Sequence, residues 1–281
     1  MDLVSDRPDE YPNMPDEDRS LFKAAAEEIS PLYPYEPGFF TTERSDSREL
    51  GNEMDDDIGR GFETPILVLL IHHLSRLHTF RMTDYTMSDT FQMFMRRIAA
   101  NYQNTSLAPR MPLRHLRLAA IAHHDTENSC SVDWAVYFLC VPSLKTFAAF
   151  MMGSEEISEY EENSEAYLRN TANAPVSNVE ELYFQNCQFD PQSFDTLLPM
   201  IKDLKRFSYD AGGHIVAQQD CEPRKVIRAL VNHVGHSLEE LDFAEVTIGS
   251  EVCALKHVKL YTNSSTTGWR GGHQVSFNSR L

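Results

Sequence analysis

Several short segments of the chain alternate apolar and polar residues, as half-buried β-strands do. The clearest is NVEELYFQNCQF, residues 178–189, whose apolar residues follow the spacing L-x-x-L-x-L-x-x-N/C-x-L with Cys187 at the N/C position. The same spacing recurs in LEELDFAEVTI and LHTFRMTDYTM. Less complete copies are LRHLRLAAI, with Leu113, Leu116, Leu118 and Ile121, then LKTFAAF, LKRFSY and LKHVKL. Successive copies begin mostly about 25 to 36 residues apart.

Helical patterns occupy the intervals between these segments. In DPQSFDTLLPMIKDL, Asp190 is expected to be the N-cap, Pro191 the first helical residue, and Pro199 the point where the helix ends or kinks. EPRKVIRALVNHVG ends on Gly235, placed like a C-cap, and SDTFQMFMRRIAANY and CSVDWAVYFLCV are two further helices. The alternation predicts an α/β leucine-rich-repeat solenoid, with a curved parallel sheet on the concave face and helices on the convex face. A doubly wound sheet is the alternative, although no glycine-rich turn follows the first strand.

The repeat pattern divides the strand residues into two sets. In residues 178–189, Leu182 and Phe184 are expected in the core and Cys187 at the bend, where it can hydrogen-bond backbone groups. The intervening residues are expected on the concave face, where exposed Arg and Tyr side chains could anchor a partner. The candidate binding residues are Arg81, Thr83, His115, Arg117, Thr146, Tyr183, Gln185, Ser208, Asp242 and Lys259.

The rest of the chain is divided by composition. Residues 1–60 are expected to form an acidic, partly disordered segment with one helix at about residues 17–30, followed by a loop or linker over 31–61. TPILVLLIHHLSRL then predicts a helix with Thr64 as N-cap, and one of its two adjacent histidines, His72 or His73, is expected to be half-buried. Residues 61–262 are expected to form the repeat domain, and 263–281 a disordered tail.

Charge and cysteine content narrow the classes of partner. The formal net charge of −17 over 281 residues argues against nucleic acid and against an anionic membrane, and the 25 Lys and Arg residues show no basic stripe along the sequence. A basic partner surface suits this charge, although acidity also serves solubility. Five cysteines without a CxxC pair fit neither a disulfide framework nor a zinc site. The absence of a signal-peptide pattern and of a long apolar stretch predicts a cytoplasmic or nuclear protein.

Candidate catalytic and metal-binding patterns are weak. No G-x-S-x-G, P-loop or G-x-G-x-x-G motif occurs, so we expect no enzyme activity, no cofactor and no metal. The best metal candidate is the trio His123, His124 and Asp125, but adjacent strand residues point to opposite faces. The acidic run 154–165 lacks the spacing of a calcium loop, and the C-terminal Ser279-Arg280-Leu281 is interpreted as a chance match to a peroxisomal signal.

The order of several segments carries a resemblance to a known family. These segments cover residues 20 to 248 and are LFKAAAEEI, LHTFRM, LAPRMPLRHLRLAAIAHHDTENSCSVDW, VPSLKTFAAFMMG, NVEELYFQNCQFDPQSFDTLL, IKDLKRFSYDAGG and RKVIRALVNHVGHSLEELDF. The chain resembles the fungal F-box-associated leucine-rich repeat proteins of filamentous ascomycetes. The resemblance implies that the repeats hold a substrate while an F-box, a short three-helix segment, docks on the adaptor of a cullin–RING ubiquitin ligase. The first 60 residues depart from this pattern, since they lack the Leu-Pro-x-Glu-Ile/Leu segment of an F-box.

These observations favour a non-enzymatic scaffold that binds a protein or peptide on its concave face, with substrate recognition for ubiquitin ligation as the role that the resemblance implies. Two alternatives stay open. One is a metal-dependent hydrolase that uses His123, His124 and Asp125. The other is a decayed paralogue without a partner.

Overall fold

A computed structural model of the chain describes residues 14–34, 49–84, 90–124, 129–154, 176–212, 222–245 and 257–261. Within these residues, seven strands form one sheet in the order β1-β2-β4-β6-β7-β8-β9, so that each strand pairs with the next one along the sequence. The strands are β1 (Thr79–Asp84), β2 (Leu118–His123), β4 (Thr146–Phe150), β6 (Glu181–Cys187), β7 (Arg206–Ala211), β8 (Glu240–Glu245) and β9 (His257–Tyr261). All pairs from β1 to β8 are parallel.

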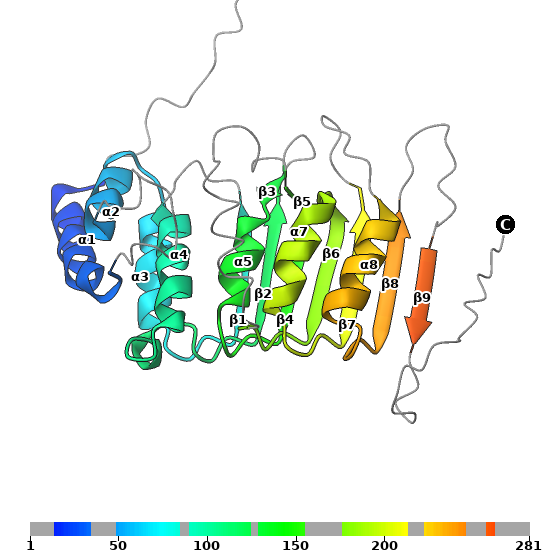
Figure 1. Cartoon of the computed structure of the whole chain (residues 1–281). Helices are drawn as coiled ribbons and strands as arrows, with labels where there is room; N and C mark the ends of the chain where they lie inside the picture. Colours follow the sequence, from blue (N-terminus) through cyan, green and yellow to red (C-terminus); the bar gives the residue numbers. More distant parts are fainter. Residues whose placement is uncertain are drawn as a thin grey trace, which may run out of the picture.

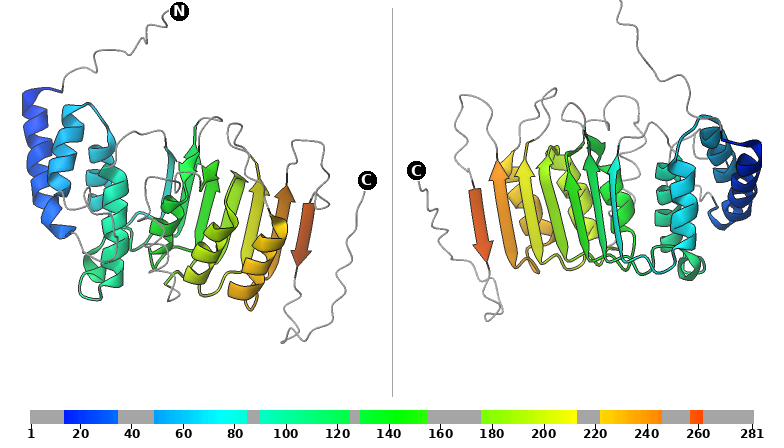
Figure 2. Two further views of the ribbon diagram at one scale, coloured as in Figure 1. Left: turned by 45° about the horizontal axis from the view of Figure 1, so that its top comes forward. Right: turned by 180° about the vertical axis from the view of Figure 1, so that it is seen from behind.

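The helices between the strands lie on one face of the sheet (Figures 1 and 2). They are α4 (Thr90–Gln103), α5 (Asp133–Leu139), α7 (Pro191–Leu197) and α8 (Pro223–His233). A doubly wound sheet reverses its strand order and carries helices on both faces, so that alternative is wrong for this chain. We call the face that the described helices leave uncovered the open face.

Two rows of inward side chains fill the space between sheet and helices. The strand registers align Phe147 of β4 with Leu182 of β6 and Phe207 of β7, all at most 1 % exposed. In the next row, Phe184 lies with its ring centroid 6.3 Å from that of Phe147 and 6.1 Å from that of Phe207. Each buried ring contributes about 1.5–3 kcal/mol of hydrophobic stabilisation. The alternation of the strand segments therefore predicted the core face of β6 correctly, with Leu182 and Phe184 inside.

The segment LRHLRLAAI adopts a different phase from the one its leucines suggest. Leu116, not Leu113, takes the position equivalent to Leu144 and Val179, so Ala119 and Ile121 point inward and Leu118 points outward. Leu113 has a left-handed backbone with φ 64° and lies in the turn before the strand. The leucine spacing allowed both phases, and strand pairing selected one of them.

The last strand also departs from the expected pattern. The segment LKHVKL was expected to add a further parallel strand, but β9 runs antiparallel to β8. In this register Lys259 lies opposite Asp242 and Leu260 lies opposite Leu241.

Within the described residues 14–34 and 49–78, three helices precede the first strand: α1 (Asp16–Ile29), α2 (Leu50–Gly59) and α3 (Thr64–His73), with the short 3-10 helix η1 (Ser30–Leu32) after α1. They pack against one another and on α4, beside the β1 end of the sheet (Figure 1). Helix α2 lies where a loop was predicted. Leu50, Met54 and Ile58, four residues apart, form its buried stripe. Met54 belongs to the same continuous core as Phe147 and Leu182.

One of the three consecutive aspartates in α2 is buried. Asp57 is only 4 % exposed, and its carboxylate accepts a hydrogen bond from the hydroxyl of Thr90, the first residue of α4. The loop predicted over residues 31–61 is wrong at this point, because helix α2 forms and tertiary contact supplies a partner for the Asp57 carboxylate. Together with the packing of Met54, this contact joins α2 to the helices beside the sheet.

The predicted helix boundaries agree with the structure at most points. Asp190 caps α7, since its Oδ1 accepts a hydrogen bond from the Ser193 backbone N–H at 2.8 Å, and a 3-10 turn, η4 (Leu198–Met200), ends the helix at Pro199. Thr64 is the first residue of α3 and not its cap, which is Glu63. Of the helices in the described part of the chain, none has the length and apolar content to span a membrane.

Candidate binding surface on the open face of the sheet

Outward strand residues line up across the open face because the strands pair in register. The central row contains Arg81, Ala120, Ala148, Tyr183, Ser208 and Asp242. The next row, toward the carboxyl ends of the strands, contains Thr83, Ala122, Phe150 and Gln185. In the central row, the short side chains of Ala120 and Ala148 are thus flanked by the long side chains of Arg81 and Tyr183.

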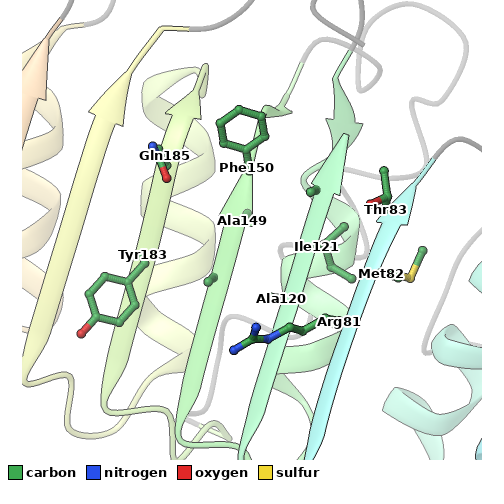
Figure 3. Close-up of a pocket in the computed structure, with 11 residues that line it drawn as sticks. Arg81, Met82, Thr83, Ala120, Ile121, Ala149, Phe150, Tyr183 and Gln185 are labelled. Atoms are coloured by element: carbon green, nitrogen blue, oxygen red, sulfur yellow. The ribbon is translucent and has the colours of Figure 1, made fainter. Parts of the chain in front are cut away.

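This arrangement forms a hollow of about 370 Å³ over β1, β2, β4 and β6, which we call the trough. Its floor consists of Ala120, Ala122 and Ala148, whose side chains end at Cβ. Figure 3 shows Tyr183 and Phe150 standing beside this floor, and Arg81 extending from β1 over β2. The trough is shallow rather than enclosed.

A network of ion pairs lies beside the trough, at the amino-terminal ends of β4 to β8. Glu180 accepts hydrogen bonds from Lys145 Nζ and Lys205 Nζ, both at 2.6 Å. These two ammonium groups lower the pKa of Glu180 to about 2. Lys145 and Lys205 thus share one carboxylate partner within the protein.

A second set of contacts joins β6, β7 and β8 on the open face. Glu181 pairs with Arg206, whose Nε lies 3.4 Å from Oε2 of Glu240. Glu181 also accepts hydrogen bonds from the hydroxyls of Thr146, at 3.2 Å, and Tyr183, at 3.3 Å. Tyr183 is thereby held at the wall of the trough.

The amino-terminal ends of the strands form one edge of the sheet, and this edge is basic at β1 and β2. Five side chains lie immediately before β1 and β2 and are exposed, and we call them the basic edge. They are Arg76, His78, Arg114, His115 and Arg117. The rings of His78 and His115 are stacked with centroids 6.2 Å apart. The Arg117 backbone N–H donates to the His78 carbonyl oxygen at 2.8 Å, which places the two segments side by side.

The predicted binding residues occupy different places relative to this surface. Seven of the ten lie in the strands and point to the open face: Arg81, Thr83, Thr146, Tyr183, Gln185, Ser208 and Asp242. Lys259 pairs with Asp242 in the register of β8 and β9. His115 and Arg117 lie in the turn before β2, not on the strand, because LRHLRLAAI adopts the other phase.

Four outward residues of the trough were missed by the sequence argument. They are Ala120, Ala122, Ala148 and Phe150. Alanines carry no polar group that marks a binding site, and the wrong phase of LRHLRLAAI removed Ala120 and Ala122 from the outward set. The register of LKTFAAF, with Leu144 and Phe147 inward, was sufficient to find Ala148 and Phe150.

Cys187 fulfils the structural role expected for it. Its side chain is fully buried, and Sγ accepts a hydrogen bond from the Met152 backbone N–H at 3.4 Å. Burial raises the pKa of the Cys187 thiol to about 12, so the thiol stays protonated near neutral pH. Such a group is no nucleophile.

The histidine pair that suggested a metal site lies at the end of β2. His123 is the last residue of the strand and His124 follows it, with ring centroids 4.9 Å apart. Asp125, the remaining member of the trio, lies outside the described residues, as do residues 155–165 of the acidic run and the C-terminal Ser279-Arg280-Leu281. Among the residues that the structure describes, no three His, Cys, Asp or Glu side chains are grouped as ligands of one metal ion.

Comparisons with family models, with curated proteins and with solved structures find no match for this chain. The functional argument therefore depends on the geometry of the open face and on the sequence pattern.

Proposed function

We propose that this protein is a non-enzymatic scaffold of the leucine-rich-repeat type that binds a protein or peptide partner on the open face of its sheet. The sequential strand order and the helices on one face support a solenoid, in which each strand presents equivalent outward residues to a partner. The observation that carries the proposal is the trough, where alanines of two adjacent strands lie between Arg81 and Tyr183.

The shape of the trough favours a macromolecular partner. Sites for small molecules enclose most of the ligand surface, whereas this hollow is shallow and its floor is formed by three methyl groups. A side chain of an extended or helical segment can enter it while the rest of the partner contacts neighbouring strands. Tyr183 and Arg81 at the walls belong to the residue types that contribute most to protein interfaces.

The role in ubiquitin ligation is the more specific part of the proposal. It is supported by the resemblance and by the position of α1, α2 and α3 before the first strand, the place that an adaptor-binding segment occupies in the family. Leu70 on α3 and Leu74, the residue that follows this helix, are 52 % and 48 % exposed, as expected of a segment that meets a partner. Recovery of a ligase adaptor with the protein would support this role.

Affinity purification with mass spectrometry of the co-purified proteins tests the proposal. The wild-type chain is compared with Ala148→Arg, which fills the trough, and with Asn232→Arg, which adds the same charge on exposed α8 behind the sheet. We expect specific partners to be lost with Ala148→Arg and kept with Asn232→Arg. Identical partner sets for all three proteins would contradict a binding role of the trough.

A further inference from the structure

The basic edge is an exception in a strongly acidic protein. The chain has a net charge of −17, yet three arginines and two histidines gather before β1 and β2, and Arg81 follows two residues into β1. The segments that precede β6 and β8 on the same edge contain Glu180 and Glu239 instead. The sheet is thus polarised along this edge, from positive at β1 and β2 to acidic or neutralised at β6 to β8.

The arginines at the positive end differ from the other cations of this edge in their described contacts. In the described part of the chain, no carboxylate lies within ion-pair distance of Arg76, Arg81, Arg114 or Arg117. Arg117 makes one long hydrogen bond, from Nη1 to the Ser143 carbonyl oxygen at 3.3 Å. By contrast, Lys145, Lys205 and Arg206 on the same edge are all paired with glutamates. Among the described residues, the positive charge of these arginines is thus not paired with a carboxylate and is available to a ligand.

The basic edge is continuous with the trough. Arg81 lines the trough and is three residues from His78, a spacing of about 10 Å along a strand. Arg117 lies beside His78 and immediately precedes β2, the strand that carries Ala120 and Ala122 of the floor. An extended segment of a few residues is long enough to contact both surfaces.

We propose that the partner segment is an acidic peptide, with Asp or Glu side chains on Arg81 and the basic edge and a small apolar side chain on the alanine floor. This inference depends on the proposed function of the open face. Arginine binds carboxylates in bidentate geometry, which fixes orientation as well as charge. The negative net charge of the protein has little effect on this contact, because salt screens exposed charges that lie farther away than about 8 Å at physiological ionic strength.

A nucleic acid is the other polyanion to consider, and the structure disfavours it. Nucleic-acid binding depends on a series of phosphate contacts along an extended basic surface. Here the arginines without a described carboxylate partner end at β2, and farther along the edge Lys145, Lys205 and Arg206 are already paired with glutamates. A short acidic segment needs no extended basic surface, since its carboxylates can be confined to β1 and β2.

Selection of short random peptides displayed on phage, with the full chain as bait, tests the inference. We expect the selected peptides to be enriched in Asp and Glu next to a small apolar residue and to bind more weakly as salt is raised. The double variant Arg81→Glu with Arg117→Glu should bind the selected peptides at least about tenfold more weakly, since it replaces attraction by repulsion at two contacts. The matched control is Arg224→Glu with Arg228→Glu, which makes the same charge change at exposed sites on α8.

Each outcome decides a separate point. In one outcome, the selected peptides are not enriched in acidic residues, do not bind Ala148→Arg and still bind the double variant of Arg81 and Arg117. This result would overturn the acidic assignment and leave the proposed function intact. Peptides insensitive to both changes would overturn both. Binding of a homopolymeric RNA at an affinity similar to the best peptide, weakened by the same double variant, would replace the peptide by a nucleic acid. Circular dichroism of each variant establishes that it is folded.

Discussion

Met151 and Asn186 adopt the same left-handed backbone conformation at equivalent places in neighbouring strands, with φ of 56° and 51°. Met151 follows Phe150 and Asn186 follows Gln185, and these two preceding residues are paired in the register of β4 and β6. At Met151 the chain leaves β4, whereas Asn186 lies in β6 where the register with β7 shifts, and Cys187 after it still pairs with Ala211 of β7. Met152 and Gly153 form the short strand β5, which pairs with β3 (Cys130–Ser131). In both strands the left-handed residue thus interrupts the regular strand at the same level of the sheet.

Asn186→Val should destabilise the protein by about 1–2 kcal/mol, because a β-branched side chain is strained at positive φ. Asn186→Gly should change the stability by less than about 0.5 kcal/mol, since glycine adopts this conformation without strain. Urea unfolding followed by fluorescence measures both values. Equal stabilities of the two variants would show that the backbone conformation of Asn186 imposes no constraint.

Gly235→Ala should cost about 1–3 kcal/mol. A Cβ atom at Gly235 would lie 2.7 Å from the Val231 carbonyl oxygen and 3.1 Å from its Cα, and this helix backbone cannot move aside cheaply. Gly59→Ala is the matched control. There the close atom is the mobile end of Arg19, so alanine should be neutral or should stabilise α2 by up to about 1 kcal/mol. Thermal unfolding of both variants distinguishes these effects.

His72 should make stability depend on pH below its ordinary pKa of 6.5. The Tyr33 hydroxyl lies 2.6 Å from His72 Nδ1, and burial lowers the pKa of His72 in the folded protein. The unfolded chain therefore takes up the proton first as the pH falls. Stability from neutral His72 is fully present above pH 6.5 and decreases as the pH falls through the folded pKa. His72→Gln should flatten this part of the urea-midpoint profile, and an unchanged slope would assign the dependence to another group.

Glu180→Gln should lower stability by about 0.5–1 kcal/mol at neutral pH, because one carboxylate holds two ammonium groups in a partly exposed network. The pKa of Glu180 is lowered to about 2, so its contribution is present above about 4.5 and disappears as the pH falls toward 2. High salt should reduce the difference between wild type and variant. A difference that is independent of salt would contradict an electrostatic origin.

The sequence predicted those features that depend on local alternation and helix signals. Leu182 and Phe184 lie in the core, Asp190 caps α7, and Pro199 ends it, because apolar spacing and capping chemistry act within a few residues. Helix α2 was missed because the Pro, Gly and charge content of residues 31–61, including three consecutive aspartates, indicated a loop or linker. Its burial depends on contact with α4, which no local pattern describes.

The sequence by itself determined which residues of each strand segment are apolar enough to form the core, and with them the alternation that leaves the others outside. Only the tertiary structure decided which outward residues become neighbours. Strand pairing brought Ala120 next to Ala148 to form the floor of the trough, and brought His78 next to Arg117 to form the basic edge. Segments far apart in the chain become adjacent because backbone hydrogen bonds and core packing fix the register, so the binding surface is a property of the register and not of any one segment.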